Sequence, residues 1–134
     1  MEIKEVFTVV QDVIHHSIGK PKEEINMDST LFDDLGVDSI DLVDILYELE
    51  TSYDVELKVS DIEARVKQEL GNVPYEKDGV ITPMGINAIK EFMNEIDTNQ
   101  IKDGLTVHKL VQLFSVHSLC KLVIYRLEAI NSEA

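Results

Sequence analysis

The sequence has one cysteine and few basic residues, and each shortage excludes a class of protein. Cys120 alone cannot form an internal disulfide and is typical of a reducing compartment. The 12 Lys and Arg stand against 26 Asp and Glu, giving a net charge of −14. Nucleic acid and anionic membranes attract basic residues, so neither is an expected partner. We expect a cytoplasmic monomer that meets basic protein surfaces.

The sequence also lacks a long apolar run. No stretch approaches the roughly 18 apolar residues that a membrane-spanning helix needs, so a membrane protein is not expected. The N-terminus, MEIKEVFTVV, has no basic segment followed by a long apolar one, and we identify no signal peptide. With 134 residues, the chain fits one domain over residues 1–134.

Motifs for metals and catalysis are missing as well. Loops that start at Asp33 or Asp97 do not place oxygen ligands at the positions of a calcium loop. His117 and Cys120 are three residues apart, but two ligands are too few for zinc. No G-x-S-x-G motif surrounds Ser39. We therefore expect no metal, no catalytic residue and no enzymatic activity.

What the sequence does contain is helical periodicity. Apolar residues recur at helical spacing from Ile3 to Ile18, before Gly19 and a proline. Further helices are predicted over about 39–53 and over 60–70. Another should start after Thr82-Pro83, with apolar positions as far as Ile96. Two more are predicted after Thr106 and after Ser115. A turn is expected at 78–79, with 80–81 briefly extended, and no strong strand signal is found. The fold class is predicted to be all-α.

The most unusual stretch surrounds Ser39. Between Glu23 and Leu57 there are twelve Asp or Glu and no Lys or Arg. Gly36 gives the backbone freedom shortly before Ser39, which stands at the start of the 39–53 helix. Taken alone, Ser39 is explained by a helix N-cap, worth about 1 kcal/mol.

That helix has two apolar faces at 100° per residue. The wide face is expected in the core, and its residues are Leu42, Ile45, Leu46, Leu49 and Tyr53. A narrow stripe lies on another side, formed by Ile40, Val43 and Tyr47, with Asp41, Asp44, Glu48 and Glu50 along its edges. Such a stripe fits a docking surface for basic partners. Periodicity alone fits equally a helix that is buried on both sides.

Read as a whole, the stretch FDDLGVDSI at 32–40 and the acidic helix after it resemble the acyl carrier protein family. The family hallmark is D-S-L after an L-G pair. The resemblance implies a four-helix bundle with 4′-phosphopantetheine, taken from coenzyme A, on Ser39. It also implies docking through Ile40, Asp41, Val43, Asp44, Tyr47 and Glu50, and Asp38 matches the acidic residue before the attachment serine. With Asp38 and with Glu48 from the edge of the stripe, these form the predicted docking residues.

The implied function is to hold acyl chains as thioesters for fatty acid, lipid or related biosynthesis. Implied partners are a phosphopantetheinyl transferase and acyl synthases and acyltransferases with basic patches. Two alternatives remain: a stand-alone peptidyl or polyketide carrier, and an unmodified helical interaction protein.

The sequence departs from the family in three places. Ile40 replaces the usual Leu, and Thr51 stands where many members have an acid. Residues 59–105, called the insert below, are much longer than the usual third-helix region. We expect them to add about two helices before the last ones. The insert either deepens an apolar cleft for an unusual chain or only enlarges the core.

Overall fold

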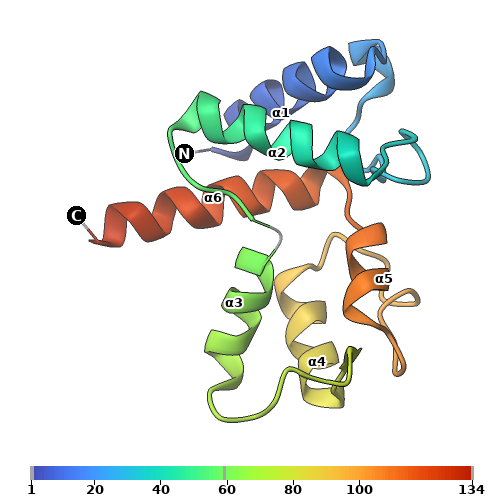
Figure 1. Cartoon of the computed structure of the whole chain (residues 1–134), viewed down its shortest axis with the longest axis vertical. Helices are drawn as coiled ribbons and strands as arrows, with labels where there is room; N and C mark the ends of the chain where they lie inside the picture. The colour runs from blue at the N-terminus through green and yellow to red at the C-terminus, as the bar shows by residue number, and fades with distance from the viewer. Residues whose placement is uncertain (1, 59, 134) are drawn as a thin grey trace.

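The computed structural model describes residues 2–58 and 60–133, and the side chains of these except 60, 62, 63, 69 and 130–133. Helices dominate the described chain, and the all-α fold class is confirmed. The elements are α1 (Ile3–Ile18), the 3-10 helix η1 (Lys22–Glu24), α2 (Ser39–Tyr53), α3 (Ser60–Leu70), β1 (Glu76–Lys77), β2 (Val80–Ile81), α4 (Pro83–Phe92), α5 (Val107–Gln112) and α6 (Val116–Glu133). They form two layers, with α1, α2 and α6 in one and α3, α4 and α5 in the other (Figure 1).

The first layer is built on amphipathic helices, and we call it the carrier layer: α1, α2, α6 and the link 19–38. α1 buries Val6, Val10, Val13 and Ile14, which lie on one helical face. It packs against both α2 and α6. It ends at Gly19, whose φ of 74° is left-handed and whose N–H donates to the His15 carbonyl at 2.9 Å.

The second layer consists of α3, α4 and α5. α3 packs on α4. Thr82 caps α4, since its hydroxyl accepts a hydrogen bond from the Gly85 N–H at 3.1 Å, and Pro83 follows as the first helical residue. α4 ends at Phe92 instead of continuing to Ile96, which is nevertheless buried.

A small hairpin precedes α4. β1 and β2 pair antiparallel through an Asp78-Gly79 turn, in which both residues have positive φ, 54° and 84°. Two left-handed residues are typical of the tightest hairpin turn. The predicted turn is confirmed, but each strand has only two residues, too few to give the alternating pattern that predicts a strand.

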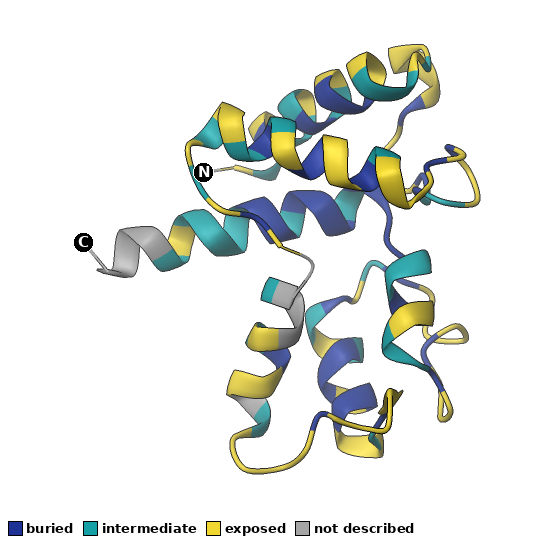
Figure 2. Ribbon diagram, in the orientation of Figure 1, coloured by how far each residue is buried: buried dark blue, intermediate teal, exposed yellow. Residues whose placement is uncertain are grey.

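The layers meet along the connection between α5 and α6. The Leu31 N–H donates to the Phe114 carbonyl, and the Val116 N–H donates to the Ser29 carbonyl, each at 2.9 Å. The link is therefore paired to the chain entering α6. Buried side chains of both layers form one hydrophobic cluster (Figure 2).

A buried ion pair also crosses this junction. Glu95 has a side chain that is 4% exposed, and its Oε1 lies 2.7 Å from Lys121 Nζ. Its Oε2 accepts a hydrogen bond from the Ser118 hydroxyl at 2.9 Å. Lys121 Nζ also donates to the Phe92 carbonyl at 2.9 Å. The segment after α4 is thus fastened to α6 by charge as well as by apolar packing. Among the described residues, no helix has the length and apolar character needed to cross a membrane.

Candidate functional site

The link brings Ser39 to the surface in a fixed position. The Val37 N–H donates to the Leu31 carbonyl at 2.8 Å, and Val37 is only 3% exposed. Between them, Gly36 has φ 71°, a left-handed conformation that side chains disfavour. Val37 is thus anchored in the core two residues before Ser39, which is exposed.

The N-cap of α2 is Asp38, not Ser39. Asp38 Oδ1 accepts a hydrogen bond from the Asp41 N–H at 2.8 Å, and Asp41 Oδ2 accepts one from the Asp38 N–H at 3.2 Å. This reciprocal pair is a capping box. The alternative that Ser39 serves only as the cap is therefore wrong. Ser39 is the first residue of the helix, and its hydroxyl is not needed to start it.

The serine environment fits a phosphodiester. Ser39 lies in the first turn of α2, where unpaired N–H groups and the helix dipole favour negative charge. The side chain is exposed, so an esterified group extends into solvent without displacing a core residue. The cap of α2 does not involve the Ser39 hydroxyl, so a group attached there would leave the cap intact.

α2 presents two faces, as the periodicity predicts. Leu42, Ile45, Leu46 and Leu49 are buried. The stripe on the other side is open, with Ile40 74%, Val43 65% and Tyr47 68% exposed. The alternative that this helix is buried on both sides is wrong. Exposed large apolar side chains gathered on one helix are typical of a contact surface.

The predicted acidic residues lie in different settings along the stripe. Asp44 is exposed, whereas Asp41, Glu48 and Glu50 are half-buried. Glu48 Oε1 lies 3.9 Å from His16 Nε2 of α1, an ion pair only when the histidine is protonated. Asp38 and Asp41 are engaged in the capping box, so any contact they make with a partner is additional to a structural role. In the sequence, this capping box could have been predicted from the two aspartates three positions apart, Asp38 and Asp41.

An acidic hollow of about 460 Å³ continues the stripe beyond Tyr47. It is lined by Tyr47, Glu50, Thr51, Asp54, Val55 and Glu56. The last turn of α2 has no basic residue, although the negative end of the helix dipole favours one there. Among the described residues, no ion pair neutralises the three acids of this hollow. This end of α2 is consequently complementary to positive charge.

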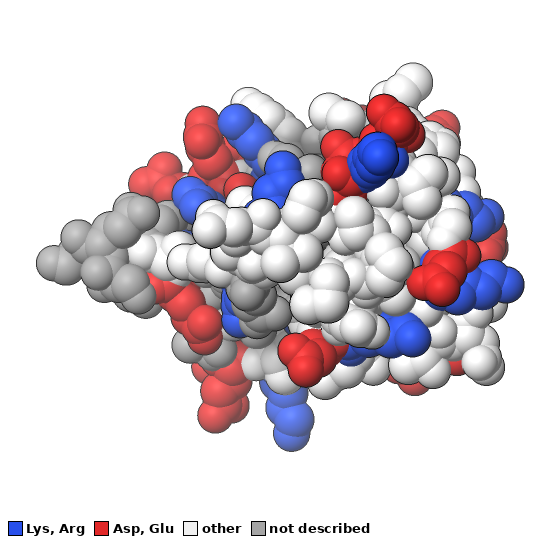
Figure 3. All heavy atoms as spheres, turned by 90° about the horizontal axis from the view of Figure 1, so that it is seen from below, with Lys and Arg blue, Asp and Glu red and all other residues white. Residues whose placement is uncertain are grey.

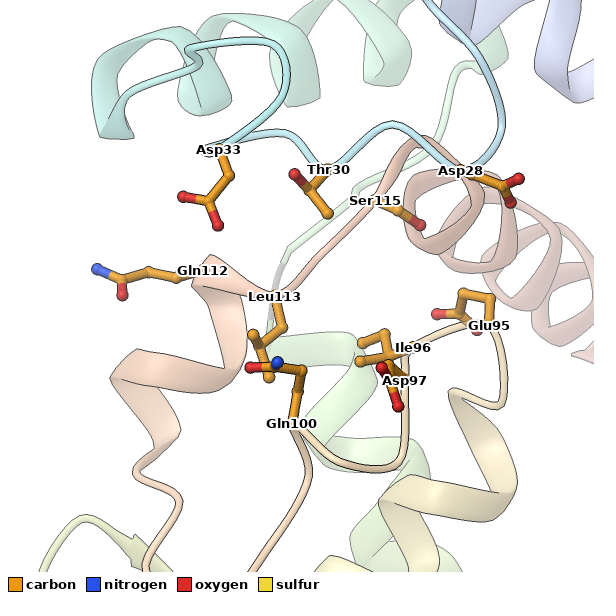
Figure 4. A pocket seen from close by; sticks show the side chains of 10 residues that line it. All are labelled: Asp28, Thr30, Asp33, Glu95, Ile96, Asp97, Gln100, Gln112, Leu113 and Ser115. Atoms are coloured by element: carbon orange, nitrogen blue, oxygen red, sulfur yellow. The ribbon is translucent and has the colours of Figure 1, made fainter.

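A second cavity, of about 340 Å³, lies between the layers (Figure 4). Its side chains come from the link, the loop after α4, the end of α5, and the connection between α5 and α6. They are Asp28, Thr30, Asp33, Glu95, Ile96, Asp97, Gln100, Gln112, Leu113 and Ser115. This polar lining does not suit a saturated chain. Within the described part of the chain, no group of three His, Cys, Asp or Glu could hold a metal.

Cys120 lies on the buried face of α6. It is 0% exposed, and burial raises the pKa of its thiol to about 12. A protonated, buried thiol is inert toward acyl transfer. Because Cys120 is the single cysteine, acyl transfer to a thiol would need a thiol that no side chain of this protein supplies.

Comparisons with known proteins agree with this geometry. A family model described as a phosphopantetheine attachment site matches residues 6–72, from α1 through α3. The chain is 40% identical to an acyl carrier protein of Clostridium acetobutylicum, over 51% of this chain and 86% of the relative. It is 41% identical to one of Lactococcus lactis subsp. cremoris, over 52% of this chain and 90% of the relative. No solved structure matches.

A helical protein that matches an attachment-site model over half its length is a carrier of a prosthetic group. This chain belongs to the acyl carrier protein family, and its prosthetic group is 4′-phosphopantetheine. The predicted family, carrier function and cofactor are thereby confirmed. The match extends through α3 to residue 72, so it includes the first part of the insert predicted at 59–105.

Proposed function

We propose that Ser39 is the attachment residue and that this chain performs no catalysis of its own. The observation that carries the proposal is the exposed Ser39 beside a helix cap that Asp38 makes without it. In the active site of a phosphopantetheinyl transferase, the Ser39 oxygen displaces adenosine 3′,5′-bisphosphate from coenzyme A. The serine proton passes to a base of the transferase. When attached, the group supplies a thiol that holds an acyl chain as a thioester.

The residues of this chain then present the cargo to other enzymes. Ile40, Val43 and Tyr47 supply apolar contact, while Asp44, Glu48 and Glu50 attract a basic surface. Asp38 and Asp41 hold the first turn of α2, which fixes the direction in which Ser39 points. Partners of this kind are acyl synthases and acyltransferases of fatty acid, lipid or related biosynthesis in the cytoplasm. Docking is weak, fast and sensitive to salt.

Intact mass spectrometry tests the attachment residue. The wild-type chain, incubated with coenzyme A and a broad-specificity transferase, gains the mass of one phosphopantetheine, and Ser39→Ala gains none. Because Ser39 is exposed and does not cap α2, Ser39→Ala changes the free energy of unfolding by less than about 0.5 kcal/mol.

Ser52→Ala is the matched control. Ser52 is an exposed serine near the other end of the same helix, with its hydroxyl bonded to the Glu48 carbonyl. This variant is modified like the wild type. An unmodified wild-type chain, beside a control carrier that is modified, would refute the proposal. Mass spectrometry of the protein from cells, with its cargo attached, then identifies the acyl chain.

A further inference from the structure

Large apolar side chains are exposed in two places on the described part of the chain. One is the α2 stripe. The other is the tip of the insert, residues 71–84, where Val73 and Val80 are each 40% exposed and Met84 is 51% exposed. The tip lies at the far end of the molecule from α2 (Figure 1). Surfaces of this kind mark contact sites with other molecules.

The tip differs from the α2 stripe in charge. It contains Glu76, Lys77 and Asp78 and no other charged residue, so it carries −1 of the total −14. The face of the molecule at this end is largely uncharged, with acidic and basic side chains side by side at its edge (Figure 3). A basic partner has little to attract it here.

Hydrogen bonds hold the tip in one conformation. The Thr82 hydroxyl donates to the Pro74 carbonyl at 2.6 Å, and the Thr82 N–H donates to the Tyr75 carbonyl at 2.9 Å. The Gly79 N–H donates to Glu76 Oε2 at 2.7 Å, which closes the hairpin turn. The exposed apolar side chains are therefore presented by an ordered surface, which lowers the entropy lost on binding.

The charge pattern of the tip is complementary to itself. In a two-fold pair, both copies use the same surface, and each contact between two different residues occurs twice. Lys77 lies between Glu76 and Asp78 in sequence, so each copy offers one lysine to an acid of the other. At surfaces other than the tip, two chains that each carry a net charge of −14 repel each other. Tip-to-tip contact places the acidic α2 surfaces at opposite ends, beyond the Debye length of about 8 Å at physiological salt.

We propose that two copies of this chain associate tip to tip, through the apolar side chains at 73, 80 and 84 with Lys77 paired to an acid of the partner. The contact surface is small, so the dimer is weak and forms at high protein concentration. Dilute protein at low salt is monomeric, in keeping with its net charge. In the dimer, Ser39 and the α2 stripe of both copies stay open.

Sedimentation velocity tests the association from about 10 µM to about 1 mM, at about 0.02 M and about 0.5 M NaCl. The weight-average mass of the wild type rises from 15.2 kDa toward twice that value with concentration. The rise is larger at high salt, because salt screens the repulsion between the chains. A wild type that stays at the monomer mass at about 1 mM and high salt overturns the proposal.

Variants locate the contact. Met84→Glu and Lys77→Glu each weaken the dimer at least tenfold, because they place like charges together or remove the lysine. Val43→Glu on the α2 stripe makes a matched change at an exposed residue and shifts the dissociation constant less than twofold. If Met84→Glu and Lys77→Glu associate like the wild type, or if Val43→Glu alone disrupts the dimer, the tip is not the contact. Modification of Ser39 is measured separately by mass and does not depend on this result.

Discussion

The carrier layer and the insert are both helical, but their surfaces differ. Residues 1–58, which contain the carrier layer except α6, hold 15 acidic and four basic side chains, a net charge of −11, and expose an apolar stripe on one helix. Residues 59–105 hold nine acidic and five basic side chains, a net charge of −4, and expose apolar side chains around a hairpin. Residues 1–58 can thus attract a basic protein over a long range. The insert offers only short-range contact.

The two regions also depend on each other for stability. The link that leads to Ser39 is paired by its backbone to residues 114–117, and the chain after α4 is fixed to α6 by the Glu95–Lys121 pair. The insert is therefore joined through α6 to the link that leads to Ser39. Changes at this junction are expected to have the largest effects on stability.

Lys121→Met should have the largest effect. It leaves the Glu95 carboxylate, 4% exposed, without its cation, and we expect a loss of about 3–5 kcal/mol in the free energy of unfolding. Urea denaturation measures this loss. Lys22→Met is the control, because it breaks the exposed pair with Asp12 and costs less than about 1 kcal/mol. Equal losses in the two variants would mean that the junction ion pair is not important.

Gly85→Ala should come next. A Cβ there would lie 2.7 Å from the Tyr75 carbonyl oxygen and 2.8 Å from Ile81 Cγ2, so we expect a cost of about 1–3 kcal/mol. In the carrier layer, Gly36→Ala meets no atom within 4 Å and is opposed only by its left-handed backbone, for about 1 kcal/mol. Thermal unfolding measures the loss of stability in both variants. It thereby compares the cost of a steric clash in the insert with the cost of an unfavourable backbone conformation in the link. A smaller loss of stability for Gly85→Ala than for Gly36→Ala would contradict the expectation that steric crowding at Gly85 costs more than the left-handed backbone at Gly36.

Charge reversal on α2 should act on rate instead of stability. Asp44→Lys with Glu50→Lys is expected to lower kcat/KM for phosphopantetheinyl transfer about tenfold, because rim charges steer association. Asp41 is left unchanged, since its carboxylate belongs to the capping box. Glu23→Lys with Glu24→Lys makes the same charge change on η1. If both double variants slow transfer equally, only net charge matters and α2 is not a docking surface.

Asp38→Ala should have the smallest effect, a loss of about 1 kcal/mol, because it removes the N-cap of α2. Asp38→Asn keeps an oxygen acceptor and should restore most of the stability. Asp33→Ala, at an exposed aspartate that is not a helix cap, is the control and should change little. Chemical denaturation of the three variants measures the differences. No difference between Asp38→Ala and Asp33→Ala would show that the box contributes nothing.

Local signals explain which features the sequence predicts well. The periodicity from Ile3 to Ile18 and the Thr82-Pro83 start correspond to real helix ends, because caps and breakers act within one turn. The two faces of α2 could be assigned for the same reason, since one helix fixes the direction of each side chain. The attachment motif is likewise contiguous in sequence. These features need no knowledge of distant contacts.

The sequence by itself thus determined the fold class, the family and the exposed stripe beside Ser39. Tertiary structure decided that Asp38 caps α2, that residues 29–31 pair with residues 114–116, and that Glu95 meets Lys121. The physical reason is range. Periodicity and helix propensity depend on residues three or four positions apart, whereas these backbone pairs and the ion pair join residues far apart in the chain and exist only once the layers have packed. The cap is local, but Asp38 and Ser39 are both good N-caps, and only the folded backbone selects between them.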